Sequence, residues 1–253
     1  MLAPWPSRLR DGRYRFGGAE HRMALTEPER RNALHGLTTR RTWRSAYASS
    51  HRVVLAHDLS GEDGYPFRLR LQASYELIDH GVVATLLAVN AGDAPAPFGI
   101  GLHPYLRLEG VPVDDLVLDL PAQTHVPVDE RLLPAGNPVP VAGTELDFRH
   151  ARAIGPLALD TCFADLARDA EGIARVVLSA PSQDRRLTLW MDERFRFVQV
   201  YTGDTLPDPA RRRGGVAIEP MTCAPDAFNS GDGLVVLAPG ESFSARCGLR
   251  FSG

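Results

Sequence analysis

One glutamate near the C-terminus has the setting of a general base. Glu219 ends the apolar run Gly215-Val216-Ala217-Ile218, and Pro220 follows it directly. Proline lacks a backbone donor, so we expect it to end the strand and hold the carboxylate at the strand terminus. A carboxylate between apolar neighbours and a rigid turn is suited to accepting a proton. The alternative is a solvated glutamate, because Glu is mostly exposed in proteins.

Two histidines lie in motifs that contain glycine or proline. His103 follows Gly101-Leu102 and precedes Pro104-Tyr105, and His35 lies in Asn32-Ala33-Leu34-His35-Gly36. Histidine is the side chain best suited to exchange protons near neutral pH. Trp43, further along, offers an apolar face on which a sugar could stack. The alternative for each histidine is a structural role within a turn.

Two more polar side chains interrupt apolar segments. Asp160 is the acid of Leu159-Asp160-Thr161-Cys162-Phe163, where it could cap a turn or bind a substrate hydroxyl. Gln199 alternates with Phe197 and Tyr201, so the three side chains share one strand face. An amide among aromatic side chains is costly unless it is hydrogen-bonded. A sugar hydroxyl is the partner we expect for it.

The sequence lacks the motifs of several other enzyme classes. It contains no cysteine–histidine metal motif, no nucleophile elbow, no dinucleotide fingerprint and no phosphate loop. All 28 basic residues are arginine, so no lysine can form a Schiff base with a sugar. Proton transfer on a neutral polyol, with neither metal nor cofactor, fits the candidate residues best.

The composition indicates a turn-rich globular protein. Of 253 residues, 23 are Gly and 20 are Pro, which favours many short strands. A net charge of −3 provides no global attraction for nucleic acid or for an anionic membrane. Three cysteines form no disulfide framework, and neither a signal peptide nor a long apolar run is present. We therefore expect a cytoplasmic protein.

Alternating apolar and polar residues predict an all-β fold. Residues 67–77 and 82–89 are expected to form an antiparallel hairpin. Further strands are predicted at 186–191 and 195–201, joined through 192–194, and at 234–237 and 243–251. Only 152–166 has helical character, and Gly155-Pro156 interrupts it. The pattern predicts one domain over residues 1–253, a large antiparallel β-sandwich.

Six segments, in order, resemble motifs of the aldose 1-epimerase (galactose mutarotase) family. They are residues 2–12 with Arg8, Asn32 to Gly36, Leu102 to Tyr105, Asp160 to Phe163, Gln199 to Gly203, and Glu219-Pro220. Three positions depart from the family pattern. Ser7 stands where asparagine is usual, Thr161 where histidine is usual, and Pro104 where a small polar residue is common.

The resemblance implies the galactose mutarotase-like supersandwich and a catalytic assignment. Glu219 would take the proton of the C1 hydroxyl, and His103 would protonate the ring oxygen. Arg8, His35, Asp160 and Gln199 would bind the sugar hydroxyls. The family has strands before the first of these motifs, whereas this chain begins almost on it. We therefore expect those strands to be lacking and a sheet edge or part of the core to be uncovered, in a monomer or homodimer.

Three other functions compete with a mutarotase acting on a free hexose or related aldose. Arginines at 40–41, 44 and 211–213 suggest a sugar-phosphate variant, since guanidinium pairs well with phosphate. The departure at Thr161 suggests a carbohydrate-binding protein without turnover. A glycoside hydrolase would need two carboxylates flanking the scissile bond, and only Glu219 and Asp160 are candidates.

Overall fold

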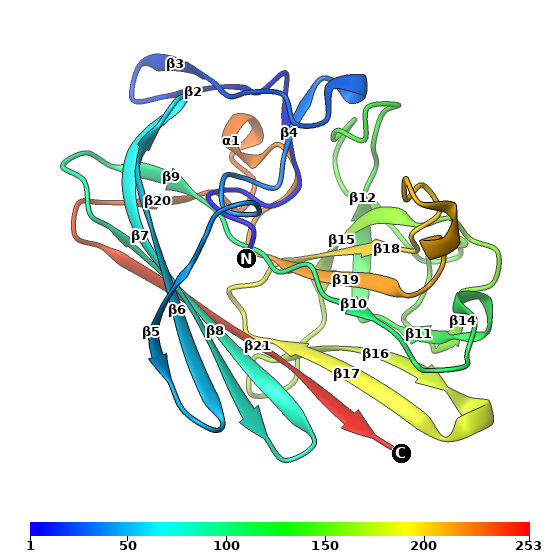
Figure 1. The fold of residues 1–253 in the computed structure, drawn as a ribbon. Helices are drawn as coiled ribbons and strands as arrows, with labels where there is room; N and C mark the ends of the chain where they lie inside the picture. The colour runs from blue at the N-terminus through cyan, green and yellow to red at the C-terminus, as the bar shows by residue number, and fades with distance from the viewer.

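The computed structural model describes residues 1–253, apart from the side chain of Pro181, and is built almost entirely of antiparallel strands (Figure 1). The larger sheet has nine strands in the order β14-β11-β16-β17-β21-β8-β7-β6-β5. These are β5 (Arg44–Ala48), β6 (Arg52–Glu62), β7 (Tyr65–Ile78), β8 (Gly81–Asn90), β11 (Val117–Asp119), β14 (Arg152–Ala153), β16 (Ala174–Ala180), β17 (Arg185–Met191) and β21 (Ser242–Ser252).

The smaller sheet has six strands in the order β10-β19-β18-β15-β12-β13 and lies over the β11, β16 and β17 part of the larger sheet (Figure 1). These are β10 (Tyr105–Leu106), β12 (Ala122–Val126), β13 (Val139–Pro140), β15 (Asp160–Leu166), β18 (Phe197–Tyr201) and β19 (Val216–Met221). One cluster of buried apolar side chains fills the space between the two sheets, with Val200 and Ile218 from one side and Leu178 and Leu189 from the other. The predicted all-β sandwich is confirmed.

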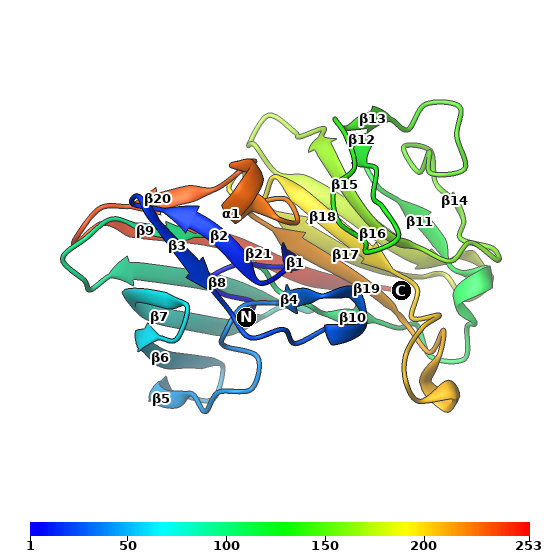
Figure 2. The ribbon, with the colours of Figure 1, turned by 90° about the horizontal axis from the view of Figure 1, so that it is seen from above.

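Small two-stranded sheets cover the end of the sandwich seen at the top of Figure 1. Viewed from above in Figure 2, the N-terminal strands cross the molecule beside a short helix from the C-terminal part of the chain. The elements are β1 (Arg8–Arg10) with β4 (Asn32–Leu34), β2 (Arg13–Phe16) with β3 (Ala19–Arg22), β9 (Ala96–Phe98) with β20 (Val235–Leu237), and α1 (Ala227–Ser230). This layer brings β1 and β4 next to the open face of the six-stranded sheet.

The predicted hairpin of residues 67–77 and 82–89 is confirmed, because β7 pairs with β8 from Leu69 opposite Asn90 to Ile78 opposite Gly81. The strands predicted around 192–194 also form, but they do not pair with each other. β17 pairs with β16 and β21 in the larger sheet, while β18 pairs with β15 and β19 in the smaller one. The link between them therefore carries the chain from one layer of the sandwich to the other.

The expectation that Pro220 ends its strand is wrong. β19 continues through Pro220 to Met221, and Glu219 lies inside the strand. The amides of Ile218 and Thr222 both point away from β18, toward Pro104 and Ile100. The missing donor of Pro220 falls on that same side, where the neighbouring segment is irregular, so proline is tolerated as it is at a sheet edge.

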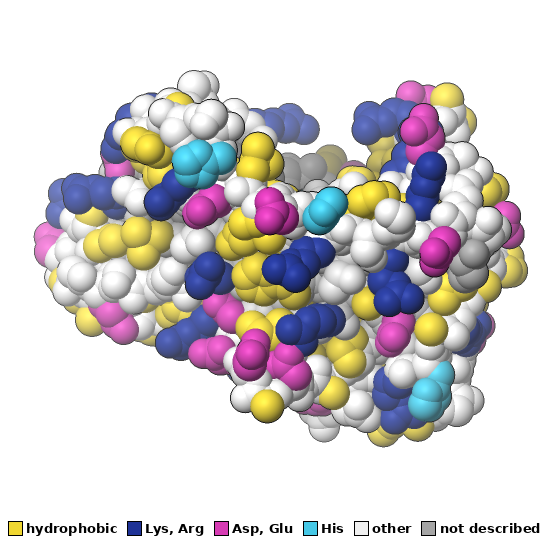
Figure 3. Space-filling view, turned by 90° about the horizontal axis from the view of Figure 1, so that it is seen from below, with side chains coloured by type: hydrophobic (Ala, Val, Ile, Leu, Met, Phe, Trp, Pro, Cys, Tyr) yellow, Lys and Arg dark blue, Asp and Glu magenta, His cyan; other side chains and the backbone are white. Residues whose placement is uncertain are grey.

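One face of the larger sheet carries exposed apolar side chains near the ends of β7 and β21. Leu77 is 61% exposed and Phe251 is 42% exposed. Viewed from below, hydrophobic side chains gather beside a hollow in the surface (Figure 3). Among the described residues, no helix is long and apolar enough to cross a membrane.

Candidate active site

All six predicted site residues line one pocket of about 300 Å³ on the open face of the six-stranded sheet. That volume is at the lower end of the range for small-molecule sites. The pocket walls come from β1, β4, β10, β15, β18, β19 and the loop after β18. The lining residues are Ser7, Arg8, Glu27, Glu29, Arg30, Leu34, His35, His103, Tyr105, Asp160, Gln199, Tyr201, Thr205, Leu206, Pro207 and Glu219.

Strand register places the three sheet residues together. Gln199 lies directly opposite Glu219, and Asp160 lies opposite Tyr201, two residues along the same face of β18. Residues directly opposite or two apart share a face of the sheet, so all three side chains point into the pocket. The Gln199 amide nitrogen donates to Asp160 Oδ1 at 2.5 Å. The alternate residues Val198, Val200 and Ile218 point into the core.

Glu219 is a buried carboxylate with one partner. It is 2% exposed, and His103 Nε2 lies 3.1 Å from its Oε1. Burial, assisted by the charge of Asp160, raises the pKa of Glu219 well above its usual value, and Arg8 opposes this only in part. Burial also lowers the pKa of His103, although its own backbone carbonyl and Asp160 oppose the shift. Both shifts favour the neutral forms of the two side chains.

Two oxygens in the pocket have no donor among the described atoms, namely Glu219 Oε2 and Gln199 Oε1. Both belong to residues that are at most 6% exposed. A buried acceptor without a donor costs roughly 1–3 kcal/mol. The pocket therefore favours a ligand that presents hydroxyl groups.

His35 is held in one tautomer by the backbone of Ser7. The Ser7 amide donates to His35 Nδ1 at 3.2 Å, and the His35 amide donates back to the Ser7 carbonyl at 2.8 Å. Burial, with smaller contributions from His103 and Arg8, lowers the pKa of His35 to about 3, so the ring is neutral. Since Nδ1 accepts a hydrogen bond, the single ring proton lies on Nε2, which is a fixed donor.

The tautomer of His35 also determines whether His35, His103 and Glu219 could together bind a metal ion. Each offers a ligand atom, and these atoms lie within 4.8 Å of one another, as in a two-histidine, one-glutamate site. A metal ligand needs an unprotonated nitrogen with a free lone pair. In His35 one nitrogen is occupied by the Ser7 amide and the other by the ring proton. The chemistry of this donor set therefore does not fit a three-ligand metal centre.

Arg8 is positioned by a residue that the sequence analysis missed. Glu27, 6% exposed, accepts from Arg8 Nε at 3.0 Å and from Arg8 Nη2 at 3.1 Å, while Asp160 accepts from Nη2 at 3.4 Å. Asn32, fully buried, donates to Glu27 at 3.0 Å. Nothing local distinguishes Glu27 from the exposed Glu29 two residues later, so only the packing of residues 26–32 against β1 identifies it.

Several other residues singled out by the sequence lie outside the pocket. Trp43 packs beside His57. Thr161 lies opposite Val200 and faces away from Asp160, so this departure from the family pattern does not reach the pocket. Arg41 pairs with Glu62, and Arg213 pairs with Asp114 and Asp204.

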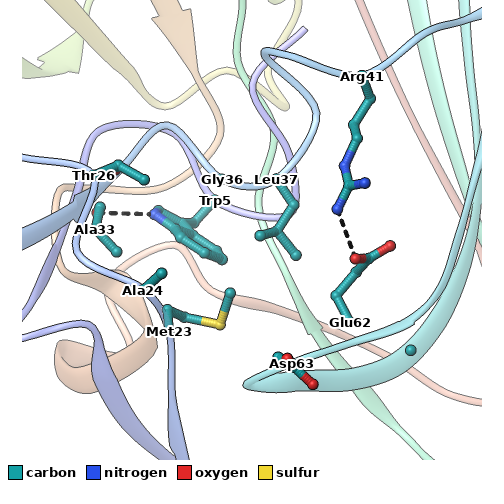
Figure 4. Close-up of a pocket in the computed structure, with 11 residues that line it drawn as sticks. Trp5, Met23, Ala24, Thr26, Ala33, Gly36, Leu37, Arg41, Glu62 and Asp63 are labelled. Carbon is teal, nitrogen blue, oxygen red and sulfur yellow. Dashed lines mark hydrogen bonds and ion pairs between the residues drawn. The ribbon is translucent and has the colours of Figure 1, made fainter.

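A larger pocket of about 430 Å³ is lined in part by Ala33, Gly36 and Leu37, from the segment on either side of His35 (Figure 4). Trp5 forms one wall, with its indole nitrogen donating to the Ala33 carbonyl at 3.4 Å. Arg41 and Glu62 meet across the opposite side at 2.6 Å. None of the six predicted site residues lines this pocket, and Arg41 and Glu62 form an ion pair with each other there.

Comparison with known proteins agrees with this geometry. The sequence pattern of the family described as aldose 1-epimerase matches residues 1–250. An Escherichia coli K12 protein named uncharacterized protein YihR is 34% identical over 95% of this chain and 75% of its own length. Human galactose mutarotase is 27% identical over 97% of this chain and 76% of its own length.

A solved structure, the galactose 1-epimerase of Lactobacillus acidophilus NCFM, superimposes with a TM-score of 0.82 and 26% identity. The match covers 99% of this chain and 78% of that protein. The sequence and the fold thus agree along nearly the whole chain, which belongs to the aldose 1-epimerase family and is an enzyme of the isomerase class.

Proposed function

We propose that this protein interconverts the α and β anomers of a free aldose, a hexose or a close relative, by acid–base opening and closure of the sugar ring. The observation that carries the proposal is the buried Glu219 carboxylate. It contacts His103 through one oxygen, and its other oxygen faces the pocket without a donor. Family membership and the names of the relatives support the same reaction.

In this mechanism Glu219 accepts the proton of the C1 hydroxyl while His103 donates a proton to the ring oxygen. The C1–O5 bond breaks, and the open aldehyde rotates about C1–C2. The C5 hydroxyl then attacks the other face of C1, returning its proton to His103 as Glu219 returns its own to the carbonyl oxygen. Each group thus acts as acid in one direction and base in the other.

The pKa shifts suit this exchange. Ring opening converts the pair from carboxylate plus imidazolium to carboxylic acid plus neutral imidazole. Burial raises the pKa of Glu219 and lowers that of His103, and both shifts favour the second state. Compared with water, the pocket therefore favours the protonation state that the pair reaches on ring opening, which assists proton transfer between enzyme and sugar.

The remaining pocket residues bind hydroxyl groups. His35 donates from Nε2, Arg8 donates from its guanidinium, and Asp160 accepts. Gln199 Oε1 accepts as well, since its amide nitrogen is committed to Asp160. Donors and acceptors on opposite sides of the pocket match a polyol, which presents both functions at every hydroxyl.

The test is the exchange rate between α and β anomers of D-glucose and D-galactose, measured by saturation-transfer NMR with and without enzyme. We expect exchange well above the buffer rate for at least one sugar. A sugar that binds in calorimetry yet exchanges no faster than in buffer would replace this proposal with a carbohydrate-binding protein. Release of reducing sugar from a disaccharide would indicate a glycoside hydrolase.

A further inference from the structure

A second hollow adjoins the sugar pocket across Tyr105 and Leu206. It has a volume of about 410 Å³ and is lined by Tyr105, Arg107, Leu206, Ala210, Arg211, Gly214 and Gly215. Tyr105 and Leu206 also line the sugar pocket, so the two spaces share a wall. Among the described residues no aspartate or glutamate lines this hollow, whereas two arginines do.

The arginines of this loop differ in what they contact. Arg212 donates to the Leu206 carbonyl at 2.9 Å, and Arg213 holds two carboxylates and two backbone carbonyls. Arg211, the last residue of the 3₁₀ turn Pro209–Arg211, makes no side-chain hydrogen bond or ion pair with any described residue, and neither does Arg107. Both are exposed. The fold uses Arg212 and Arg213 to close the loop and leaves the other two beside the hollow.

In the proposed mechanism the C6 group of the sugar lies beside His103, whose ring stacks on Tyr105 of the shared wall. C5 bears both the ring oxygen and C6, so a sugar whose ring oxygen meets His103 places its C6 substituent next to that histidine. Tyr105 stacks on His103 with ring centroids 5.2 Å apart. Burial is the main cause that raises the pKa of Tyr105 to about 12, and Arg211 is close enough to oppose it. The phenol is therefore a hydrogen-bond donor at the shared wall.

We propose that this hollow is a subsite for a tetrahedral oxyanion on C6 of the aldose, a phosphate or sulfate ester, bound by Arg107 and Arg211. Guanidinium groups bind such oxyanions through paired hydrogen bonds. The inference rests on the proposed mutarotase function and adds the substrate class. It also corrects the sequence expectation, since of the arginines at 40–41, 44 and 211–213 only Arg211 lines this hollow.

The test compares anomer exchange of glucose, glucose 6-phosphate and glucose 6-sulfate above their buffer rates. We expect kcat/KM for the better of the two esters to exceed that for glucose at least tenfold. Which ester is the better substrate shows whether the subsite prefers phosphate or sulfate. In the double variant Arg107→Ala/Arg211→Ala that preference should fall at least tenfold. Arg250→Ala, an exposed arginine on β21, serves as the charge control and should retain the preference.

Two results would overturn the subsite. One is an ester that is no better than glucose while glucose itself is turned over. The other is a double variant that lowers the rates for ester and glucose by the same factor. If no sugar exchanges, the proposed function fails. Calorimetry then tests the subsite separately. Glucose 6-phosphate must still bind the wild-type protein more tightly than glucose does, and the double variant must lose this difference in affinity.

Discussion

Two buried glutamates in the same pocket have opposite surroundings. Glu27, on the wall formed by residues 26–32, is 6% exposed and accepts from Arg8, Arg30 and Asn32. Burial raises the pKa of Glu27, but these hydrogen bonds and charges outweigh it and leave the pKa below its usual value. Glu219, on the sheet, is 2% exposed and has a raised pKa, and among the described residues its side chain pairs only with His103.

The difference shows how one side-chain type serves two purposes. A carboxylate surrounded by cationic and amide donors stays ionised and fixes the position of an arginine. A buried carboxylate with an unsatisfied oxygen and little compensating charge lowers the stability of the fold, and its pKa is raised, which makes it a stronger base. Burial is common to both glutamates, so the partners rather than the burial determine the direction of the pKa shift.

The largest effect should follow from removing the single partner of Glu219. His103→Asn keeps a polar side chain but cannot transfer a proton, so kcat for anomer exchange should fall by about 10²–10⁴-fold. Saturation-transfer NMR measures this directly. His80→Asn, at the β7–β8 turn, is the control and should match wild type. A variant at position 103 with more than a tenth of the wild-type kcat would contradict the assignment.

Replacing Glu27 should primarily reduce stability and sugar affinity. Glu27→Gln leaves Arg8 without its main counter-charge in a nearly buried site, and breaking such pairs costs about 3–5 kcal/mol. Urea unfolding should show this loss, and KM should rise because Arg8 is no longer held in place. Glu20→Gln, in an exposed pair with Arg13, is the control. Unchanged stability in Glu27→Gln would mean that Glu27 does not anchor Arg8.

The pH dependence of stability should separate the two glutamates by sign. Because the folded-state pKa of Glu219 is raised, wild type should lose unfolding free energy relative to Glu219→Gln as pH rises from about 4.5 through that pKa. Because the pKa of Glu27 is lowered, its stabilising contribution is present above about 4.5 and should be lost as pH falls through the folded-state value.

Each slope is limited to about 1.4 kcal/mol per pH unit per proton. Urea midpoints for wild type and both glutamine variants provide the comparison, measured from pH 3 to 8 over the range in which each protein remains folded. If the stability of both variants relative to wild type changed with pH in the same way, the two glutamates would not differ as proposed.

The smallest effect is expected at Thr161. Its side chain lies on the face of β15 opposite to Asp160 and does not line the pocket. Thr161→His, which restores the usual family residue, should change kcat/KM by less than threefold. A gain of tenfold or more would show that this position acts on the pocket despite its orientation.

The strand pattern and six residues of the pocket could be predicted from the sequence, whereas the contacts between distant segments could not. Alternation predicted β7, an apolar run predicted β8, and the residue types singled out Glu219 and His103 as candidate proton carriers. Strand order is a long-range property, so the pairing of Gln199 with Glu219 was not visible. Neither was the contact of Glu27 with Arg8, nor the continuation of β19 through Pro220, which depends on the neighbouring segment.

The most direct test of the account compares Glu219→Gln and Glu27→Gln in the same anomer-exchange experiment, at a pH where both variants are folded. We predict that Glu219→Gln loses kcat by about 10²–10⁴-fold while remaining at least as stable as wild type at pH 8. Glu27→Gln should retain most of its kcat with a raised KM. If Glu219→Gln exchanges anomers at the wild-type rate, Glu219 is not the base and the mechanism is wrong.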